Sequence, residues 1–231
     1  MSLEQRLQDV ERRIAEACAR SGRDPGDVNV VAVTKYVSAN TARLAVEAGM
    51  RHIGENRWPA AEEKWRLLEG QAVFHYIGSL QSKKVKDVVG KFDYIHSLDR
   101  MSLAEEIHKR AVILGIRVPC FLQVNVSGED SKHGLAPAEL AGFAASIRGL
   151  HGIKPIGLMT MAPVADDPEE TRPVFSRLST LLRELNASGV LDEPLTELSM
   201  GMSGDFEVAI EEGATWVRLG SVLVGHEDMN G

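Results

Sequence analysis

The stretch VNVVAVTKYVSAN, residues 28–40, decides which fold this sequence adopts. Its first six residues, 28–33, are mostly β-branched and apolar and carry no charge, which is typical of a strand buried on both faces. Lys35 follows that strand, and Ser38, a favourable N-cap residue, begins a helix that ends at Gly49. A strand, a lysine, a turn and a helix in this order are typical of parallel α/β folds, which place their chemistry at the carboxyl ends of the strands.

Lys35 is the first candidate functional residue. An amine just past a buried strand is partly removed from water, and because desolvation penalises the ammonium form, its pKa can fall below the usual value of about 10.4. Such a lysine is a nucleophile that can form a Schiff base with a carbonyl compound. The alternative is a structural lysine held in a salt bridge at the strand end, and this stretch alone does not separate the two.

Outward from this stretch, short apolar runs alternate with helical segments along the chain. Residues 3 to about 20 carry their apolar side chains on one stripe, which predicts an amphipathic helix on the outside of the fold. Each predicted strand is followed by a helical connection, the last of which is residues 221–231. The predicted strands are residues 28–33, 52–53, 73–77, 94–96, 120–126, 155–159, 196–198 and 216–219.

This alternation predicts a parallel sheet with right-handed crossovers, and eight such units close into a (β/α)8 TIM barrel. The alternative is an open doubly wound sheet, which the lack of a Gly-rich first turn disfavours. In the longest connection, residues 162–194, the helix begins either at a cap on Asp167 or near Thr171. We expect residues 1–231 to form one α/β domain with an extra N-terminal helix.

Composition narrows the class of protein. A chain of 231 residues with 44% hydrophobic residues can bury a large core as a single domain. The net charge of −7 argues against nucleic acid or an anionic membrane as a partner. The two cysteines, Cys18 and Cys120, have no metal or redox spacing, and the charged N-terminus differs from a signal peptide. We therefore expect a soluble, cytoplasmic protein without a metal site.

Two loops rich in small residues follow the last two predicted strands. SMGMSGD, residues 199–205, offers Ser199, Ser203 and two glycines just before a helix, so its backbone N–H groups can approach an anion. Gly220 and Ser221 form a second such turn. Because TIM barrels often bind phosphate with the loops after strands 7 and 8, the pair predicts a phosphate site, and two ordinary capped turns are the alternative.

Three further side chains are candidates for contact with a ligand at the same rim. Arg218 is expected to point into the barrel, where it needs either a carboxylate from a neighbouring strand or an acceptor atom of a ligand. Asn56 follows the second strand and is either a hydrogen-bonding group beside Lys35 or a turn former. Met159 ends the sixth strand and either packs its thioether against a flat ring or belongs to the core.

Two charged segments also lie after strands. Ser79 is expected to cap a helix whose first turns carry Lys83, Lys84 and Lys86, where cations oppose the helix dipole. An anionic partner would account for these lysines, and so would a solvated basic face. The polar segment SGEDSKHGL, residues 127–135, contains Lys132 and is expected to be either a mobile lid or a surface loop.

Six stretches of the chain closely resemble the pyridoxal phosphate homeostasis proteins: VAVTKYVS, HIGEN, FHYIGSLQSKK, SGEDSKHGL, GLMTMAP and LSMGMSGDFEVAIEEGATWVRLGSVLVG. The resemblance extends over essentially the full length, and FHYIGSLQSKK and LSMGMSGD are its most specific motifs. Tyr76, where we expect Phe or Met, and RWPA after GEN depart from the family pattern. The resemblance implies a barrel like the N-terminal domain of alanine racemase, with pyridoxal 5′-phosphate (PLP) held as a Schiff base, an internal aldimine, on Lys35.

The resemblance also implies the remaining contacts with the cofactor. Arg218 would face the pyridine nitrogen and Asn56 would lie near the ring, where Met159 is a further candidate. A guanidinium accepts no proton, so it would leave that nitrogen unprotonated and weaken the ring as an electron sink. The phosphate would lie against Ser199, Ser203, Gly220 and Ser221.

The function implied by the resemblance is non-enzymatic: storing, buffering or delivering PLP to PLP-accepting apoenzymes, by a monomer or a weak homodimer. The alternative is an amino-acid racemase of the same barrel type. Racemisation needs an acid and a base on opposite faces of the ligand, and Lys35 supplies only one. The domain that supplies the other in the racemase is expected to be absent here. A Schiff-base aldolase without a cofactor is a third possibility on the same lysine.

Overall fold

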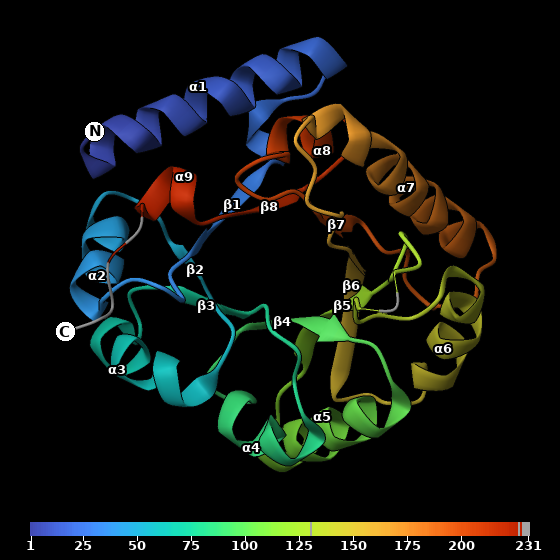
Figure 1. The fold of residues 1–231 in the computed structure, drawn as a ribbon. Coiled ribbons are helices and arrows are strands. Elements are labelled where there is room, and N and C mark those ends of the chain that lie inside the picture. Colours follow the sequence, from blue (N-terminus) through green and yellow to red (C-terminus); the bar gives the residue numbers. More distant parts are fainter. Residues whose placement is uncertain (130, 226, 228–231) are drawn as a thin grey trace.

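The computed structural model of the chain describes residues 1–129, 131–225 and 227. The strands of this part form one closed barrel in the order β1 to β8, with helices around its outside (Figure 1). The strands are β1 (Asn29–Val33), β2 (His52–Glu55), β3 (Val73–Tyr76), β4 (Tyr94–Leu98), β5 (Val118–Gln123), β6 (Ile153–Met159), β7 (Glu197–Ser199) and β8 (Trp216–Leu219).

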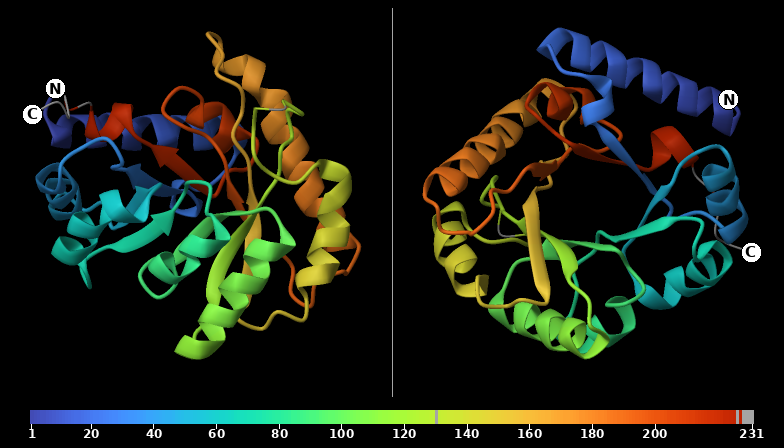
Figure 2. Two further views of the ribbon diagram at one scale, coloured as in Figure 1. Left: turned by 60° about the horizontal axis from the view of Figure 1, so that its bottom comes forward. Right: turned by 180° about the vertical axis from the view of Figure 1, so that it is seen from behind.

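Helices and short 3-10 turns connect the strands and cover the barrel (Figure 2). None of the described helices is both long and apolar enough to span a membrane. The helices are α1 (Leu3–Ser21), α2 (Ala39–Glu47), α3 (Trp58–Leu68), α4 (Val85–Val88), α5 (Met101–Leu114), α6 (Leu140–Ile147), α7 (Arg172–Ala187), α8 (Phe206–Glu211) and α9 (Ser221–Val224). The 3-10 turns are η1 (Pro25–Asp27), η2 (Ser82–Lys84), η3 (Pro137–Glu139) and η4 (Pro168–Thr171).

Pairing between the first and last strands closes the sheet. Val31 of β1 lies opposite His52 of β2 on one side and Arg218 of β8 on the other. All of these pairings are parallel, so the carboxyl ends of the eight strands meet at one rim. The (β/α)8 prediction is therefore confirmed, and the open doubly wound sheet is excluded.

Strand β5 differs from its predicted bounds. It begins at Val118 and ends at Gln123, whereas the sequence predicted residues 120–126. Beyond Gln123 the chain pairs with the end of the following loop, because the Asn125 amide donates to the Leu135 carbonyl at 2.9 Å and the Leu135 amide donates to the Gln123 carbonyl at 2.9 Å. The segment 127–135 is thus a loop that closes back onto the end of β5, and residue 130 lies outside the described part.

Helix starts were predicted less well than strands. In the longest connection both alternatives are partly right: Asp167 caps the turn η4, and α7 proper begins at Arg172. The Ser79 cap is wrong, because the helical segment begins only at Ser82, with Gln81 at its N-cap position. Of the predicted last connection, residues 221–224 form α9, whereas residues 226 and 228–231 lie outside the described part.

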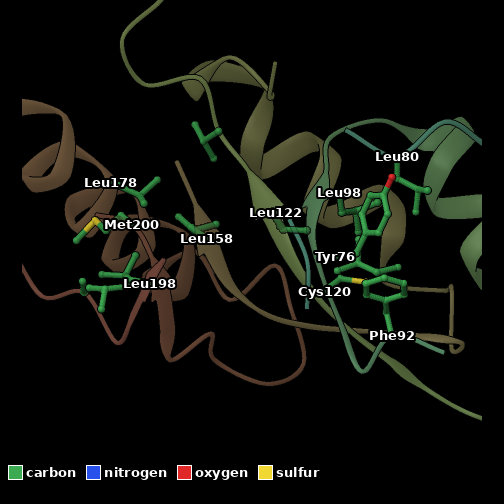
Figure 3. Close-up of a cluster of buried hydrophobic side chains, with 14 of the residues drawn as sticks. Tyr76, Leu80, Phe92, Leu98, Cys120, Leu122, Leu158, Leu178, Leu198 and Met200 are labelled. Carbon is green, nitrogen blue, oxygen red and sulfur yellow. The ribbon is translucent and has the colours of Figure 1, made fainter. Parts of the chain in front are cut away.

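Two apolar clusters form the core. The larger one lies between the outer faces of the strands and the helices, as the groups around Phe92 and Leu178 show in Figure 3. The smaller one fills the inside of the barrel with Val31, Phe121 and Met159, packed against Trp216. Each fully buried large apolar side chain contributes about 1.5–3 kcal/mol relative to an exposed one. The inner cluster forms a floor beneath the rim.

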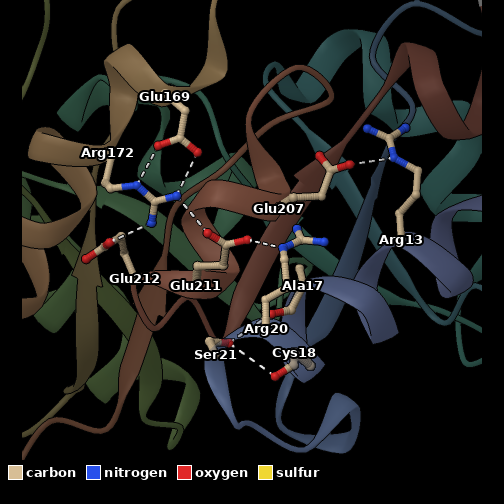
Figure 4. A network of polar contacts seen from close by, with 10 residues as sticks. All are labelled: Arg13, Ala17, Cys18, Arg20, Ser21, Glu169, Arg172, Glu207, Glu211 and Glu212. Atoms are coloured by element: carbon tan, nitrogen blue, oxygen red, sulfur yellow. Dashed lines mark hydrogen bonds and ion pairs between the residues drawn. The ribbon is translucent and has the colours of Figure 1, made fainter.

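The N-terminal helix α1 lies outside the barrel against α8 and α9 (Figure 1), and Figure 4 shows its Arg13 and Arg20 beside Glu207 and Glu211. Arg13 pairs with Glu207 at 2.7 Å and Arg20 pairs with Glu211 at 2.6 Å, so two arginines of α1 contact α8 directly. Pairs that are this exposed contribute little to stability, and the buried apolar stripe of α1 contributes more. Helix α1 thereby supports the helix that follows the loop at residues 199–205.

Gly157 should tolerate no side chain, whereas Gly142 should. A Cβ at Gly157 would lie 2.0 Å from the Glu197 carbonyl oxygen of the neighbouring strand, whereas a Cβ at Gly142 on helix α6 would meet nothing within 4 Å. We expect Gly157→Ala to lower the free energy of unfolding by about 3 kcal/mol or more. Gly142→Ala should raise it by about 0.5–1 kcal/mol, because alanine favours helix. Urea unfolding of both variants measures the difference, and equal stabilities would contradict the close approach of β6 and β7.

Candidate functional site

A cavity of about 470 Å³ lies at the rim formed by the carboxyl ends of the strands. We call it the rim cavity. Residues that follow β1, β2, β3, β7 and β8 line it, so segments far apart in the sequence meet there. No acidic residue belongs to the described lining. Six of the eight predicted site residues line it: Lys35, Asn56, Ser203, Arg218, Gly220 and Ser221.

Lys35 lies in the turn between β1 and α2. The Val37 amide donates to the Thr34 carbonyl at 3.1 Å, which forms a turn, and the two residues between them, Lys35 and Tyr36, line the rim cavity. The Lys35 amine lies 4.9 Å from the centre of the Tyr36 ring. Within the described part of the chain Lys35 forms no salt bridge. The alternative of a lysine held in a salt bridge at the strand end therefore does not apply.

A buried ion pair lies behind Lys35 and Asn56. Lys64 of α3 donates to the Glu55 carboxylate at 2.8 Å and to the Thr34 carbonyl at 2.6 Å. The Thr34 hydroxyl donates to the same carboxylate at 2.6 Å. This pair fixes Thr34 and Glu55, the residues that immediately precede Lys35 and Asn56. The Glu55 carboxylate is bound by Lys64 and is therefore not a partner of Lys35. The sequence did not reveal Lys64, because its position depends on how α3 is turned against the barrel.

The loops after β7 and β8 meet at one hydroxyl group. Ser203 accepts hydrogen bonds from the amide of Gly220 at 3.1 Å and from the amide of Val222 at 3.5 Å. The first loop is itself held by Asp205, whose carboxylate accepts from the Met202 amide at 2.6 Å. Two backbone N–H groups on this side of the rim cavity thus share one oxygen acceptor, the Ser203 hydroxyl, and a phosphate oxygen is an acceptor of the same kind.

The other two predicted site residues, Ser199 and Met159, do not line the rim cavity. They lie opposite each other in the β6–β7 pairing, one layer below the rim. Ser199 is fully buried, and Met159 is 1% exposed in the inner core. Met161, two residues further on, lines the cavity instead. Both residues lie beneath the site, and their contact with a cofactor stays a prediction.

Arg218 reaches the rim cavity from inside the barrel although it is almost fully buried. It donates to the Ser199 hydroxyl at 2.6 Å and to the Thr160 carbonyl at 3.0 Å. Burial lowers the pKa of the guanidinium to about 10, and the nearby charge of Asp205 opposes that shift. The sequence left open a carboxylate or a ligand as the partner, and within the described residues a hydroxyl and a carbonyl group take that place.

Comparisons with known proteins agree on one family. The family described as "Alanine racemase, N-terminal domain" matches residues 6–228. The pyridoxal phosphate homeostasis protein of Aquifex aeolicus is 41% identical over 222 residues, which cover 96% of each chain. The chain belongs to the family of pyridoxal phosphate homeostasis proteins.

Comparison with solved structures gives a similar result. PipY of Synechococcus elongatus PCC7942, solved with PLP bound, matches with a TM-score of 0.83 and 36% identity, covering 97% of this chain and 100% of PipY. An alanine racemase of Clostridium difficile 630 matches with a TM-score of 0.71 over 96% of this chain and 58% of the racemase. Because the racemase is only 18% identical, that likeness concerns the fold alone.

In this member of the family, a row of three histidines continues from Arg218 into the barrel, and two of them, His75 and His96, are fully buried. The Ser199 hydroxyl lies 2.8 Å from Nδ1 of His96, Nε2 of His96 lies 2.9 Å from Nδ1 of His75, and Nε2 of His75 lies 3.0 Å from Nδ1 of His52. Sequence analysis missed this row, although the three histidines belong to the consecutive strands β2, β3 and β4.

Arg218 determines where the protons of this row lie. A guanidinium can only donate, so Ser199 accepts from it and turns its own proton towards Nδ1 of His96. His96 must then donate through Nε2 to His75, and His75 through Nε2 to His52. Burial holds the pKa of His75 and of His96 well below the usual range, so both rings are neutral, as this pattern requires.

The neutral histidines should make the fold sensitive to mild acid. Below about pH 6.5 the unfolded chain takes up protons on His75 and His96, whereas the folded chain does not, because burial lowers both pKa values. The stability is therefore complete above about pH 6.5 and falls as the pH drops, by roughly 2.7 kcal/mol per pH unit for the two groups. Urea unfolding between pH 8 and pH 5.5 measures this slope.

The exposed His151 provides the control for this prediction. His151→Gln should leave the slope unchanged. Nitrogen-15 NMR of the imidazole rings should show the Nε2–H form for His75 and His96 throughout this pH range. A flat stability profile, or a His96 ring that titrates near pH 6.5, would contradict the proton arrangement.

Proposed function

We propose that this chain binds PLP in the rim cavity, attached covalently to Lys35, and serves PLP homeostasis in the cytoplasm. The observation that carries the proposal is the placement of Lys35, free of a salt bridge within the described residues, in one cavity with Ser203, Gly220 and Arg218. PipY, a relative with 36% identity over nearly the whole chain, was solved with PLP bound, which supports the same ligand here. The aldehyde would join the Lys35 amine as a Schiff base with loss of water.

The residues of the rim cavity fit the other parts of PLP. Its phosphate group would take the place of the Ser203 oxygen as the acceptor for the amides of Gly220 and Val222, and the freed Ser203 hydroxyl would donate to it as well. Its ring would be oriented by Asn56 and by Arg218, both of which line the cavity. A cavity of about 470 Å³ lies within the usual range for a small cofactor, roughly 300–1,000 Å³.

Arg218 favours holding the cofactor over turning over a substrate. When bound, PLP supplies an electron sink, and that sink is strong only if the pyridine nitrogen is protonated. The Arg218 guanidinium has no acceptor atom, so it cannot hold a proton on the pyridine nitrogen as a carboxylate can. Its hydrogen bond to the Ser199 hydroxyl fixes its orientation. A chain with this arrangement stores or delivers PLP without catalysis. The names of the relatives, which describe homeostasis proteins, support the same proposal.

The state of the two cysteines is consistent with the proposed cytoplasmic location. Cys18 and Cys120 are both free and buried, and burial raises the pKa of each thiol. Thiols of this kind react slowly and form no disulfide here, which is consistent with a reducing compartment. PLP-requiring apoenzymes in that compartment are the proposed recipients of the cofactor.

Lys35→Ala should abolish covalent attachment of PLP while leaving the barrel folded, because Lys35 is only partly buried at the rim and does not belong to the core. The measurement is visible absorbance of the imine, followed by borohydride reduction and mass spectrometry. Lys132→Ala is the matched control, since Lys132 pairs with Glu129 at 2.7 Å and does not line the rim cavity. An adduct that survives in Lys35→Ala would sink the proposal, and racemisation of any amino acid above the rate of free PLP would overturn its non-enzymatic part.

A further inference from the structure

A second cavity of about 460 Å³ lies next to the rim cavity, at the ends of β2 and β3. We call it the Trp58 cavity. The two cavities share Asn56, Gly78 and Ser79, so these residues form the wall between them. A Cβ at Gly78 would lie 2.5 Å from the Asn56 carbonyl oxygen, which shows how closely the two segments of this wall approach. The residues that line only the Trp58 cavity are Arg57, Trp58, Pro59, Tyr76, Gln81, Lys84 and Val88.

Tyr76 supplies a hydroxyl group to the Trp58 cavity. Its side chain is only 5% exposed, and its ring packs against Phe92 with the ring centres 5.3 Å apart. Figure 3 shows the hydroxyl turned away from Phe92, towards Leu80. Among the residues that the structure describes, no group forms a hydrogen bond with this hydroxyl, although the residue lines the cavity. The hydroxyl is not fully enclosed by protein atoms, so an atom of a ligand in the cavity can form a hydrogen bond with it.

The start of helix α3 also faces the Trp58 cavity. Arg57 occupies its N-cap position without a side-chain hydrogen bond, and the first turn contains no acidic residue. Helix α3 has eleven residues, so its N-terminus carries the partial positive charge of a full helix, although Pro59 in its first turn has no N–H to donate. Arg57 and Trp58 at this helix start both line the cavity.

The charged residues that line the Trp58 cavity, Arg57 and Lys84, are both cations. Arg57 forms no ion pair with the described residues, and its charge acts against the burial that raises the pKa of Tyr76. Lys84 approaches Asp87 only to 3.9 Å. Lys91 lies over the Trp58 ring, 4.4 Å from its centre. Of the described residues that line the cavity, none is acidic, although the chain as a whole has a net charge of −7.

We propose that the Trp58 cavity is a second binding site, for a phosphate monoester. Two cations, Arg57 and Lys84, and the Tyr76 hydroxyl line one cavity that also contains the start of α3, and a dianionic phosphate group gains more from two cations than a singly charged carboxylate does. Trp58 offers a flat apolar wall for the rest of the ligand. If the rim cavity holds PLP, as proposed above, the second site is a holding place for the same class of ligand beside Lys35, and this link rests on the proposed function.

The test uses the full chain without cofactor and three probes: inorganic phosphate, pyridoxine 5′-phosphate, which has no aldehyde and cannot condense with Lys35, and succinate. NMR gives a separate reporter for each cavity, namely the indole N–H of Trp58 and the backbone amide of Gly220. We expect a saturable shift of the Trp58 signal with both phosphates. Succinate should bind more weakly there than either phosphate.

Three variants test which groups hold the ligand. Tyr76→Phe removes only the hydroxyl and should weaken binding at the Trp58 reporter about tenfold, the usual effect of losing a hydrogen bond to a charged group. Lys84→Gln should weaken it about threefold or more, with less effect at high salt. Lys86→Gln is the matched control. Lys86 is an exposed lysine two residues after Lys84, in the helix that contains Asp87, and it does not line the cavity. None of the three should move the Gly220 reporter's affinity.

Several outcomes would overturn the second site. They are a Trp58 signal that does not saturate with either phosphate, a Lys86→Gln effect as large as that of Lys84→Gln, and tighter binding of succinate than of the phosphates. The site is also separable from the proposed function. Binding at Trp58 should persist in Lys35→Ala, so failure of covalent PLP attachment and failure of the second site would be seen in different signals.

Discussion

A positive charge held inside a barrel without a carboxylate in contact with it is the constraint on which the site depends. Arg218 is almost fully buried, and its partners are the Ser199 hydroxyl and the Thr160 carbonyl. Burying an unpaired charge is costly, and the pKa lowered to about 10 reflects that cost, yet the group stays charged at neutral pH. Because it can only donate, it makes Ser199 an acceptor and so sets the direction of the hydrogen bonds through His96 and beyond.

The same shortage of carboxylates gives the rim its electrostatic character. Glu55, the acidic residue of β2, is fully buried and bound by Lys64 and Thr34. Asp205 is turned back onto the amide of Met202. Neither acid lines a cavity, so both cavities are lined by cations and neutral donors in a chain whose net charge is −7. A local field of this kind concentrates anions at the rim against the charge of the whole molecule.

Sequence patterns predicted the fold and the residues of the rim well. They did not show how deep a residue lies in the barrel or which side of a helix faces the strands. Apolar strand runs and the residues after them were sufficient to bring Lys35, Ser203 and Gly220 to one cavity. Ser199 and Met159 also stand at strand ends, but they face each other one layer deeper, and that stagger between strands is not visible along a single chain. Lys64 was missed because a helical pattern does not show which side of the helix meets Glu55. The histidines were visible in principle, since a polar ring inside three consecutive apolar strands is itself a signal.

The wall between the two cavities explains how the same short segments serve both. Gly78 lies against Asn56 so closely that even a methyl group would overlap the Asn56 carbonyl, so the wall has no room to thicken. Close-packed groups of this kind pass on a displacement and do not absorb it. Asn56 is in turn fixed from behind through Glu55 and its bond to Lys64. The backbone of this wall is therefore fixed from both sides, which keeps Asn56 in the lining of both cavities.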